Sequence, residues 1–257
     1  MMNTQHLNAL LPLLSLGLVT FLLAGFVKGV IGLGLPTVAV GLLGLAMPTA
    51  EAAALLIVPS LVTNIWQLLA GPRFVALARR LWPMLIGICI GTWAGGGWLA
   101  NGGDFAGMAL GVALLAYAAL GLAAVRLHVP KSWPGARVSA LGGVIGVVTG
   151  LVTAATGVFV IPAVPFLQAL DLEKDDLVQA LGLSFTVSTI ALAAGLARDG
   201  IFHGHAIGVS LLALAPALGG MFFGQWVRGR VSAVVFRRCF FVGLAMLGAE
   251  LVIQHMR

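Results

Sequence analysis

Residues 138–170 have the sequence VSALGGVIGVVTGLVTAATGVFVIPAVPFLQAL, and none of them is charged. The runs 81–103, 177–197 and 206–227 also lack Asp, Glu, Lys and Arg. A helix crosses a hydrocarbon core about 30 Å thick with roughly 20 apolar residues, so each run is long enough for one span. Helices are expected because lipid offers the backbone no hydrogen-bond partners and the alternating pattern of barrel strands is absent. The sequence predicts an all-α polytopic membrane protein embedded in the lipid bilayer.

The composition agrees with this class. Hydrophobic residues make up 60% of the chain and charged residues 9%, whereas soluble domains are about one quarter charged. The chain has no hydrophilic stretch long enough for a soluble domain, so the function is expected inside the membrane. The net charge of +6 does not indicate a nucleic-acid partner, because the basic residues fall in short loops where they set the topology.

Two apolar segments, about 7–47 and 138–170, are too long for one span. Because Pro lacks a backbone donor and Gly loosens a helix, each segment is expected to break into two helices. The breakers are Gly29, Gly32, Gly34 and Pro36 in the first segment, and Gly150, Gly157, Pro162 and Pro165 in the second. Simpler spans are predicted at about 50–70, 80–100, 104–126, 176–197, 204–226 and 234–254.

The basic residues indicate how the long segments cross the membrane. If 138–170 forms a hairpin that returns to its own side, loops 71–82, 126–137 and 227–238 all become cytoplasmic, as the positive-inside rule expects. A single crossing would place the third loop on the opposite side. The hairpin predicts a multi-pass protein, for instance of a bacterial inner membrane, with both termini non-cytoplasmic. The loop residues are Arg73, Arg79, Arg80, Arg126, Lys131, Arg137, Arg228, Arg230, Arg237 and Arg238.

The two halves of the chain, 1–127 and 128–257, resemble each other within one integral membrane domain. A hairpin followed by three spans would place the second half upside down relative to the first. Inverted repeats with paired broken helices are typical of secondary transporters. The matches are Gly25, Val27 and Gly32 with Gly150, Val152 and Gly157, and then Pro36, Ala54 and Leu55 with Pro162, Ala180 and Leu181.

The stretches GFVKGVIGLGLP (25–36) and TGLVTAATGVFVIP (149–162), together with the duplicated layout, resemble the TauE/SafE family of sulfite exporter-like membrane proteins. The resemblance covers nearly the whole chain. It implies transport of a small anion, such as sulfite or an organosulfonate. The substrate class comes from this resemblance alone.

Lys28 is the first candidate site residue, because it is the only Lys or Arg among the first 72 residues and adjoins the first break. A buried ammonium beside unsatisfied backbone donors could attract an anion. Alternatively, Lys28 could extend its side chain to the cytoplasmic interface. Its counterpart in the second half is Thr153, so the charge is not repeated.

Polar side chains on the spans that follow the breaks are the second group of candidates. Ser60, Asn64 and Gln67 share one helical face. Ser184 and Ser188 form a similar pair, with Thr186 and Thr189 nearby. Such donors suit an oxyanion that must also be released, although Ser and Thr in membrane helices often bond to the preceding turn. The predicted substrate-binding residues are Lys28, Gly29, Gly32, Gly34, Ser60, Asn64, Gln67, Thr153, Thr156, Gly157, Ser184 and Ser188, with Pro36 and Pro162 as structural breaks.

The leading hypothesis is a secondary transporter that works by alternating access at the interface of the two repeats. An anion channel and, less favoured, an intramembrane enzyme are the alternatives. We expect no enzyme activity, because no Cys-His or Glu/His cluster lies inside a span and no nucleotide-binding loop is present. No metal and no cofactor are expected. The sequence leaves the coupling ion, proton or sodium, and the oligomeric state open.

Overall fold

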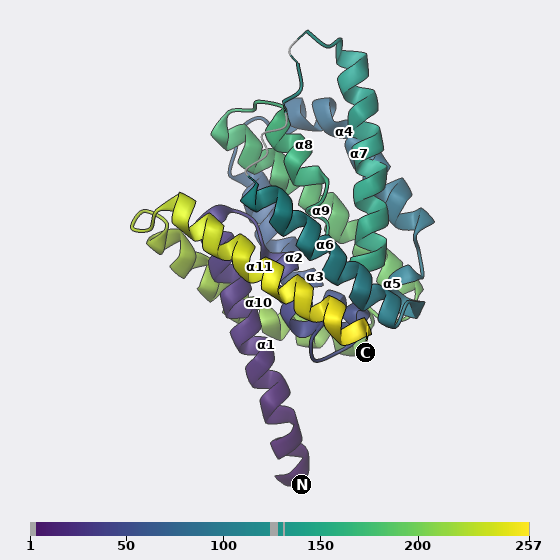
Figure 1. Cartoon of the computed structure of the whole chain (residues 1–257), viewed down its shortest axis with the longest axis vertical. Coiled ribbons are helices and arrows are strands. Elements are labelled where there is room, and N and C mark those ends of the chain that lie inside the picture. Colours follow the sequence, from purple (N-terminus) through teal and green to yellow (C-terminus); the bar gives the residue numbers. More distant parts are fainter. Residues whose placement is uncertain (1–3, 124–127, 131, 257) are drawn as a thin grey trace.

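A computed structural model of the chain describes residues 4–123, 128–130 and 132–256. All regular elements in these ranges are helices (Figure 1). In chain order they are α1 (Thr4–Ile31), α2 (Leu35–Leu43), α3 (Thr49–Leu69), α4 (Phe74–Ala94), α5 (Trp98–Asn101), α6 (Asp104–Leu122), α7 (Gly135–Thr156), α8 (Ala163–Ala169), α9 (Lys174–Arg198), α10 (Gly204–Val227) and α11 (Ala233–Met256).

Seven described helices are long and apolar enough to cross a membrane: α3, α4 together with α5, α6, α7, α9, α10 and α11. The backbone of α1 covers 28 residues, and its part Ser15–Ile31 is a shorter apolar helix. These helices confirm the predicted all-helical, multi-pass class. The predicted spans 50–70 and 204–226 agree with α3 and α10 to within one residue at each end.

The predicted extent of the loop 71–82 was wrong, because α4 already begins at Phe74. Arg has a high helix propensity, and its long side chain can reach the headgroups from a helix end, so a charge does not end a helix. Arg126 and Lys131 lie outside the described residues. The basic residues predicted in loops but found on helices are Arg79 and Arg80 on α4, Arg137 on α7, and Arg237 and Arg238 on α11.

Both long segments break within the predicted stretches, but three predicted breakers were wrong: Gly29, Gly150 and Pro165 lie inside α1, α7 and α8. Helix α1 ends at Ile31, and α2 begins at Leu35 after Gly32 and Gly34, whose φ angles are 76° and 106°. Helix α7 ends at Thr156 and is capped by Gly157 with φ 72°. Residues with side chains rarely adopt these positive angles, so glycine allows the chain to leave each helix. Pro36 lies in the first turn of α2, and Pro162 immediately precedes α8.

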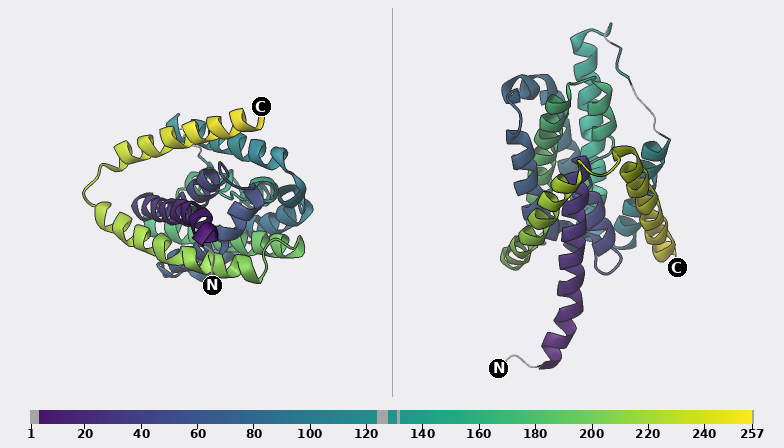
Figure 2. Two further views of the ribbon diagram at one scale, coloured as in Figure 1. Left: turned by 90° about the horizontal axis from the view of Figure 1, so that it is seen from below. Right: turned by 90° about the vertical axis from the view of Figure 1, so that its left-hand side faces the viewer.

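Helices α3 and α9 form the interior of the bundle. Of their most apolar stretches, 56% and 61% is buried, whereas the other five spans reach 22–39%. The pair α3–α9 is flanked by α10 on α3 and by α4 on α9. Helices α1 and α10 pack together, as do α4 and α7, and α6 and α11. Figure 2 shows α10 and α11 on opposite sides of the molecule, with α1 between them.

Glycines bring the backbones of the helix pairs α1–α10 and α4–α7 into direct contact. A Cβ added at Gly25 would overlap the backbone oxygen of Ala217, and one at Gly220 the oxygen of Leu22. In the other pair, Gly91 faces the oxygen of Val147 and Gly150 faces Ile88. Small residues spaced for close approach are the usual device for packing helices in lipid, where dispersion replaces the hydrophobic effect.

Two adjacent glycines on α10 test this packing. A Cβ at Gly220 would collide with α1, whereas a Cβ at Gly219 meets nothing within 4 Å. Gly220→Ala should therefore lower the free energy of unfolding by about 1–3 kcal/mol through overpacking. The matched Gly219→Ala should raise it by roughly 0.5–1 kcal/mol, because Ala favours a helix interior over Gly. Thermal unfolding in detergent measures both; equal effects would contradict the assigned contact.

Candidate functional site

Lys28 lies one turn before the end of α1 and is buried, with 5% of its surface exposed. Its ammonium Nζ donates to the hydroxyl Oγ1 of Thr63 at 3.0 Å and to the side-chain oxygen of Asn64. Both acceptors belong to α3, one of the two interior helices. The side chain thus points into the bundle, which excludes the alternative that it extends to the outer surface.

Asn64 connects Lys28 to the second half of the chain. Its Nδ2 donates to Oγ1 of Thr189 on α9 at 3.2 Å. The hydroxyls of Thr63 and Thr189 donate to carbonyl oxygens of their own helices, those of Pro59 and Phe185, each at 2.7 Å. A continuous set of hydrogen bonds therefore joins α1, α3 and α9. We call Lys28, Thr63, Asn64 and Thr189 the Lys28 network.

Gln67 attaches α3 to the first helix break. Its Nε2 donates to the carbonyl oxygen of Gly32 at 3.3 Å, while its own side-chain oxygen Oε1 has no partner among the described residues. A carbonyl freed at a helix end needs a donor, and lipid cannot supply one. The amide of Gln67 therefore stabilises the break next to Lys28.

Three buried serine hydroxyls have no hydrogen-bond partner within the described structure: those of Ser60, Ser184 and Ser188, each fully enclosed. Buried polar atoms are nearly always paired, so these hydroxyls could donate to a bound ligand or a water. The hydroxyls of Thr153 and Thr156 behave differently, because each donates at 2.7 Å to the preceding turn of α7. For the hydroxyls of Thr153 and Thr156, the structure therefore supports the alternative that they bond within their own helix.

Most of the glycines predicted in the site lie where an added Cβ would overlap a neighbouring residue, so their small size allows close packing. A Cβ at Gly29 would overlap the backbone oxygen of Met221 on α10, and one at Gly34 would lie 2.7 Å from Val27. At Gly157 a Cβ would lie 2.8 Å from the Cβ of Ala53. Only at Gly32 is there ordinary space, with Nε2 of Gln67 at 3.8 Å.

The charge of Lys28 has no carboxylate beside it. The buried charged residues of the described structure are Lys28 and Asp176. Asp176 on α9 is paired with Arg73, whose Nη1 lies 3.0 Å from the carboxylate. All described hydrogen-bond partners of Lys28 are neutral. An isolated buried charge costs several kcal/mol, so a protonated Lys28 would be unfavourable at this place without a counter-ion.

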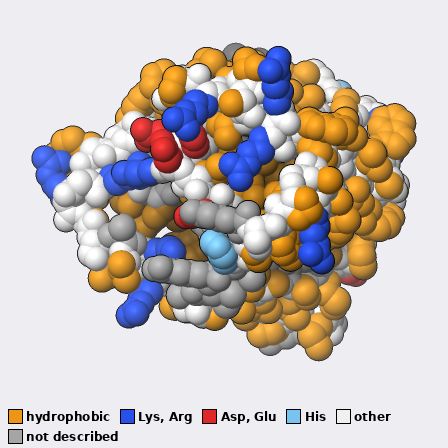
Figure 3. Space-filling model, turned by 90° about the horizontal axis from the view of Figure 1, so that it is seen from above, with side chains coloured by type: hydrophobic (Ala, Val, Ile, Leu, Met, Phe, Trp, Pro, Cys, Tyr) orange, Lys and Arg blue, Asp and Glu red, His pale blue; other side chains and the backbone are white. Residues whose placement is uncertain are grey.

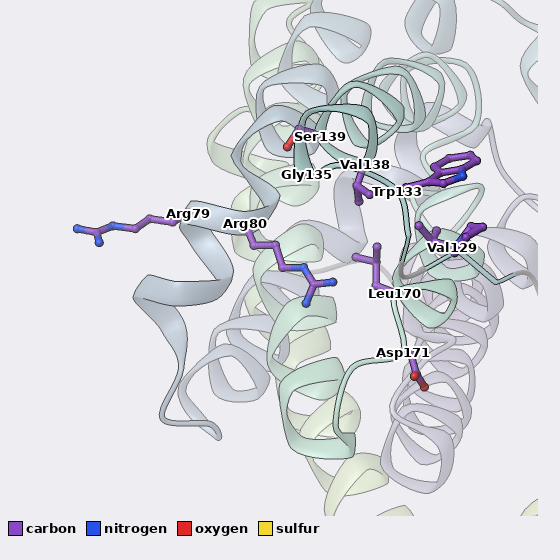
Figure 4. A pocket seen from close by; sticks show the side chains of 10 residues that line it. Arg79, Arg80, Val129, Trp133, Gly135, Val138, Ser139, Leu170 and Asp171 are labelled. Carbon is purple, nitrogen blue, oxygen red and sulfur yellow. The ribbon is translucent and has the colours of Figure 1, made fainter.

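A cavity of about 510 Å³ lies elsewhere, between α4, the start of α7 and the end of α8. In Figure 4 Arg80 points toward Leu170 and Asp171 across the cavity, whereas Arg79 points away from it. Its lining includes no member of the Lys28 network and none of the predicted site residues. In the part of the chain that the structure describes, no group of three or more His, Cys, Asp or Glu could hold a metal ion.

A comparison with known protein families matches residues 17–251 to the family described as sulfite exporter TauE/SafE. The match covers nearly the whole chain. The chain belongs to the TauE/SafE family. A search of curated proteins and a search of solved structures each gave no match.

Membership of the TauE/SafE family places the buried polar residues in a multi-pass membrane protein of a transporter family. Two members of the Lys28 network, Thr63 and Thr189, are absent from the residues predicted as binding. The signal that could have found them is the predicted correspondence between the two halves of the sequence. After the one-residue insertion that aligns Pro36 with Pro162, Thr63 falls on Thr189.

The break glycines of this TauE/SafE protein can be tested without a substrate. Gly32→Ala should cost about 1–2 kcal/mol, the penalty of a left-handed backbone angle. Gly157→Ala should cost more, because its Cβ also meets Ala53. The second change Ala53→Gly should recover part of the stability of Gly157→Ala but none of Gly32→Ala. Thermal unfolding measures all four variants; no selective recovery would contradict the contact.

Proposed function

We propose that the protein is a secondary transporter of a small sulfur-containing anion, such as sulfite or an organosulfonate. The observation that carries the proposal is the buried ammonium of Lys28, which has only neutral partners. An oxyanion there would accept a hydrogen bond from Nζ and compensate its charge. Such charge-assisted bonds are about twice as strong as neutral ones.

The unpartnered hydroxyls of Ser60, Ser184 and Ser188 are proposed as additional neutral donors to the anion. Ser60 lies one turn from Asn64 on α3, and Ser188 precedes Thr189 on α9. One positive charge combined with neutral donors would hold an anion firmly enough for selection and weakly enough for release. The remaining predicted residues, including Gly29, Gly34, Thr153, Thr156 and Gly157, would shape the helices around this site.

Alternating access of two inverted repeats, 1–127 and 128–257, is the proposed mechanism. Its support is the order and pairing of the helices, because α1, α2, α3, α4 and α6 correspond in order to α7, α8, α9, α10 and α11. Under this correspondence the pair α1–α10 becomes α7–α4, and α3–α10 becomes α9–α4, all of which are in contact. In Figure 1 α1 rises from the bottom, whereas α7 descends from the top.

An enclosed site favours a carrier over an open channel. Lys28, Thr63 and Asn64 are at most 5% exposed, and the three serines are completely buried. An ion reaching them needs a conformational change on one side or the other, as alternating access requires. An intramembrane enzyme is disfavoured because the hydroxyl of Thr63, the nearest nucleophile to Lys28, donates its proton to the carbonyl oxygen of Pro59 and not to the amine.

The proposed orientation places the basic end in the cytoplasm of a cell such as a bacterium, with both termini outside. Figure 3, seen from above, shows Lys and Arg side chains spread over the end of the molecule from which α7 starts. The start of α1 lies at the other end (Figure 1). Positive charge near the spans favours the cytoplasmic side. The coupling ion, proton or sodium, and the number of subunits are separate questions.

Lys28→Met tests the proposed anion site. Removing one partner of a buried charge pair costs about 2 kcal/mol or more, so the affinity for the anion should fall by roughly thirty-fold or more. Lys28→Arg should retain part of the affinity, because the charge persists while the geometry changes. The measurement is the apparent affinity of purified variants for sulfite, sulfate, methanesulfonate and small carboxylates, followed by uptake into liposomes.

Lys174→Met is the matched control, because Lys174 is exposed at the start of α9 and its loss removes the same charge. This variant should bind and transport as the parent does. Binding by Lys28→Met that equals the parent's would contradict the site. If the parent is present in the membrane at matched protein levels but transports no sulfur oxyanion, the proposed function is contradicted.

A further inference from the structure

We infer that Lys28 also carries the coupling ion and that this ion is a proton, an inference that rests on the proposed anion site. The amine is protonated while the anion is bound and neutral while the site is empty. Each transport cycle then moves one proton in the same direction as one anion.

The hydrogen bonds of Nζ fit both protonation states. An ammonium has three N–H donors, whereas a neutral amine has two. Two acceptors, Oγ1 of Thr63 and Oδ1 of Asn64, are in place. They satisfy both donors of the neutral amine. In the ammonium, a third N–H is left for the anion.

The neighbours of Nζ are fixed as acceptors. The hydroxyl of Thr63 donates to the carbonyl oxygen of Pro59, so its oxygen receives the N–H of Lys28. The amide nitrogen of Asn64 donates to Thr189, which turns its oxygen toward Lys28. Neither neighbour can take up the proton, because hydroxyls and amides do not accept one near neutral pH. The proton is therefore held by the amine itself.

No acidic group is placed to neutralise Lys28 in the absence of an anion. Helix α1 packs against α2, α10 and α11, and Lys28 bonds to α3. Within the described residues, no titratable group on these helices forms a hydrogen bond or an ion pair with Lys28. These groups are Glu51 on α3, His205 on α10, and Arg237, Arg238, Cys239, Glu250 and His255 on α11, of which all but the half-buried His255 are exposed; helix α2 has none.

The site is expected to be electrically neutral in both of its states: an uncharged amine without an anion, or an ammonium paired with an anion. A buried charge without a counter-ion is unfavourable by several kcal/mol, and the group avoids this by pairing or by losing its proton. With the anion X⁻, the amine takes a proton from water and forms R–NH₃⁺···X⁻. When X⁻ leaves, the N–H bond breaks and the proton returns to water on the side to which the site is open. A monovalent sulfonate would thus move without net charge.

Proton uptake on binding is the direct test. Isothermal titration of the purified parent protein with methanesulfonate or isethionate, which stay fully ionised near neutral pH, is repeated in buffers of different ionisation enthalpy. The expected uptake is about one proton per anion. Because the bound state holds more protons, affinity should weaken as pH rises, by about tenfold per pH unit once the empty site is neutral.

Lys28→Arg separates anion binding from proton coupling. A guanidinium stays protonated in proteins, so this variant should bind the anion with no proton uptake and no pH dependence. Lys174→Met should behave as the parent in both respects. In liposomes with the membrane potential clamped, an inward proton gradient should drive uptake by the parent but not by Lys28→Arg.

Two outcomes would overturn the inference and can be told apart. Anion binding by the parent with no proton uptake, or accumulation driven by sodium alone, removes the proton coupling and leaves the proposed function intact. If the parent neither binds nor transports any sulfite, sulfate or sulfonate probe, the proposed function fails and the coupling falls with it. The parent's proton count decides the question even if Lys28→Arg does not fold.

Discussion

The ammonium of Lys28 needs hydrogen-bond partners inside a structure that lipid surrounds, and α3 supplies them through Thr63 and Asn64. Lipid cannot take over this task at membrane depth. The position of α1 relative to α3 is therefore constrained to within a hydrogen-bond length. Because Asn64 also bonds to Thr189 on α9, the same constraint extends from the first half of the chain into the second.

Close packing of helices holds this arrangement in place. Gly25 and Gly220 let the backbones of α1 and α10 touch, and α10 in turn packs against α3. The break after Ile31 ends α1 one turn beyond Lys28, and Gln67 satisfies the carbonyl of Gly32 there. Lys28 and a helix end thus lie together in the interior, and the two interior helices α3 and α9 also carry three unpaired serine hydroxyls, although lipid-embedded interiors normally contain few polar atoms.

Much of the fold could be predicted from the sequence because charges are excluded from lipid-facing helices. The uncharged runs located the spans, and Gly32, Gly34 and Gly157 located the breaks. Helix starts were harder to predict, as Arg79 and Arg80 show, because Arg is a good helix former and tolerates the interface. The inverted orientation of the two halves is supported by the helix pairs but stays a prediction.

The candidate site was less predictable, because the partner of a hydroxyl depends on its rotamer and its neighbours. Thr153 and Ser188 look alike in sequence, yet Thr153 bonds to its own helix and Ser188 is unpartnered. Likewise, Gly29 stands beside Lys28 but faces α10, a direction that only the packing of α1 determines. The pattern did place Lys28, Asn64 and Gln67 in one candidate site, and the structure brings Lys28 and Asn64 into direct contact.

The most direct test of the account is to locate a bound oxyanion. Selenate has the tetrahedral shape of sulfate, and its selenium is found by anomalous X-ray scattering from crystals grown with it. The account predicts an anomalous peak beside Lys28. The oxygens of the selenate at this peak should lie about 3 Å from Nζ, a normal hydrogen-bond distance. A peak in the cavity beside Arg80, with none at Lys28, would contradict it.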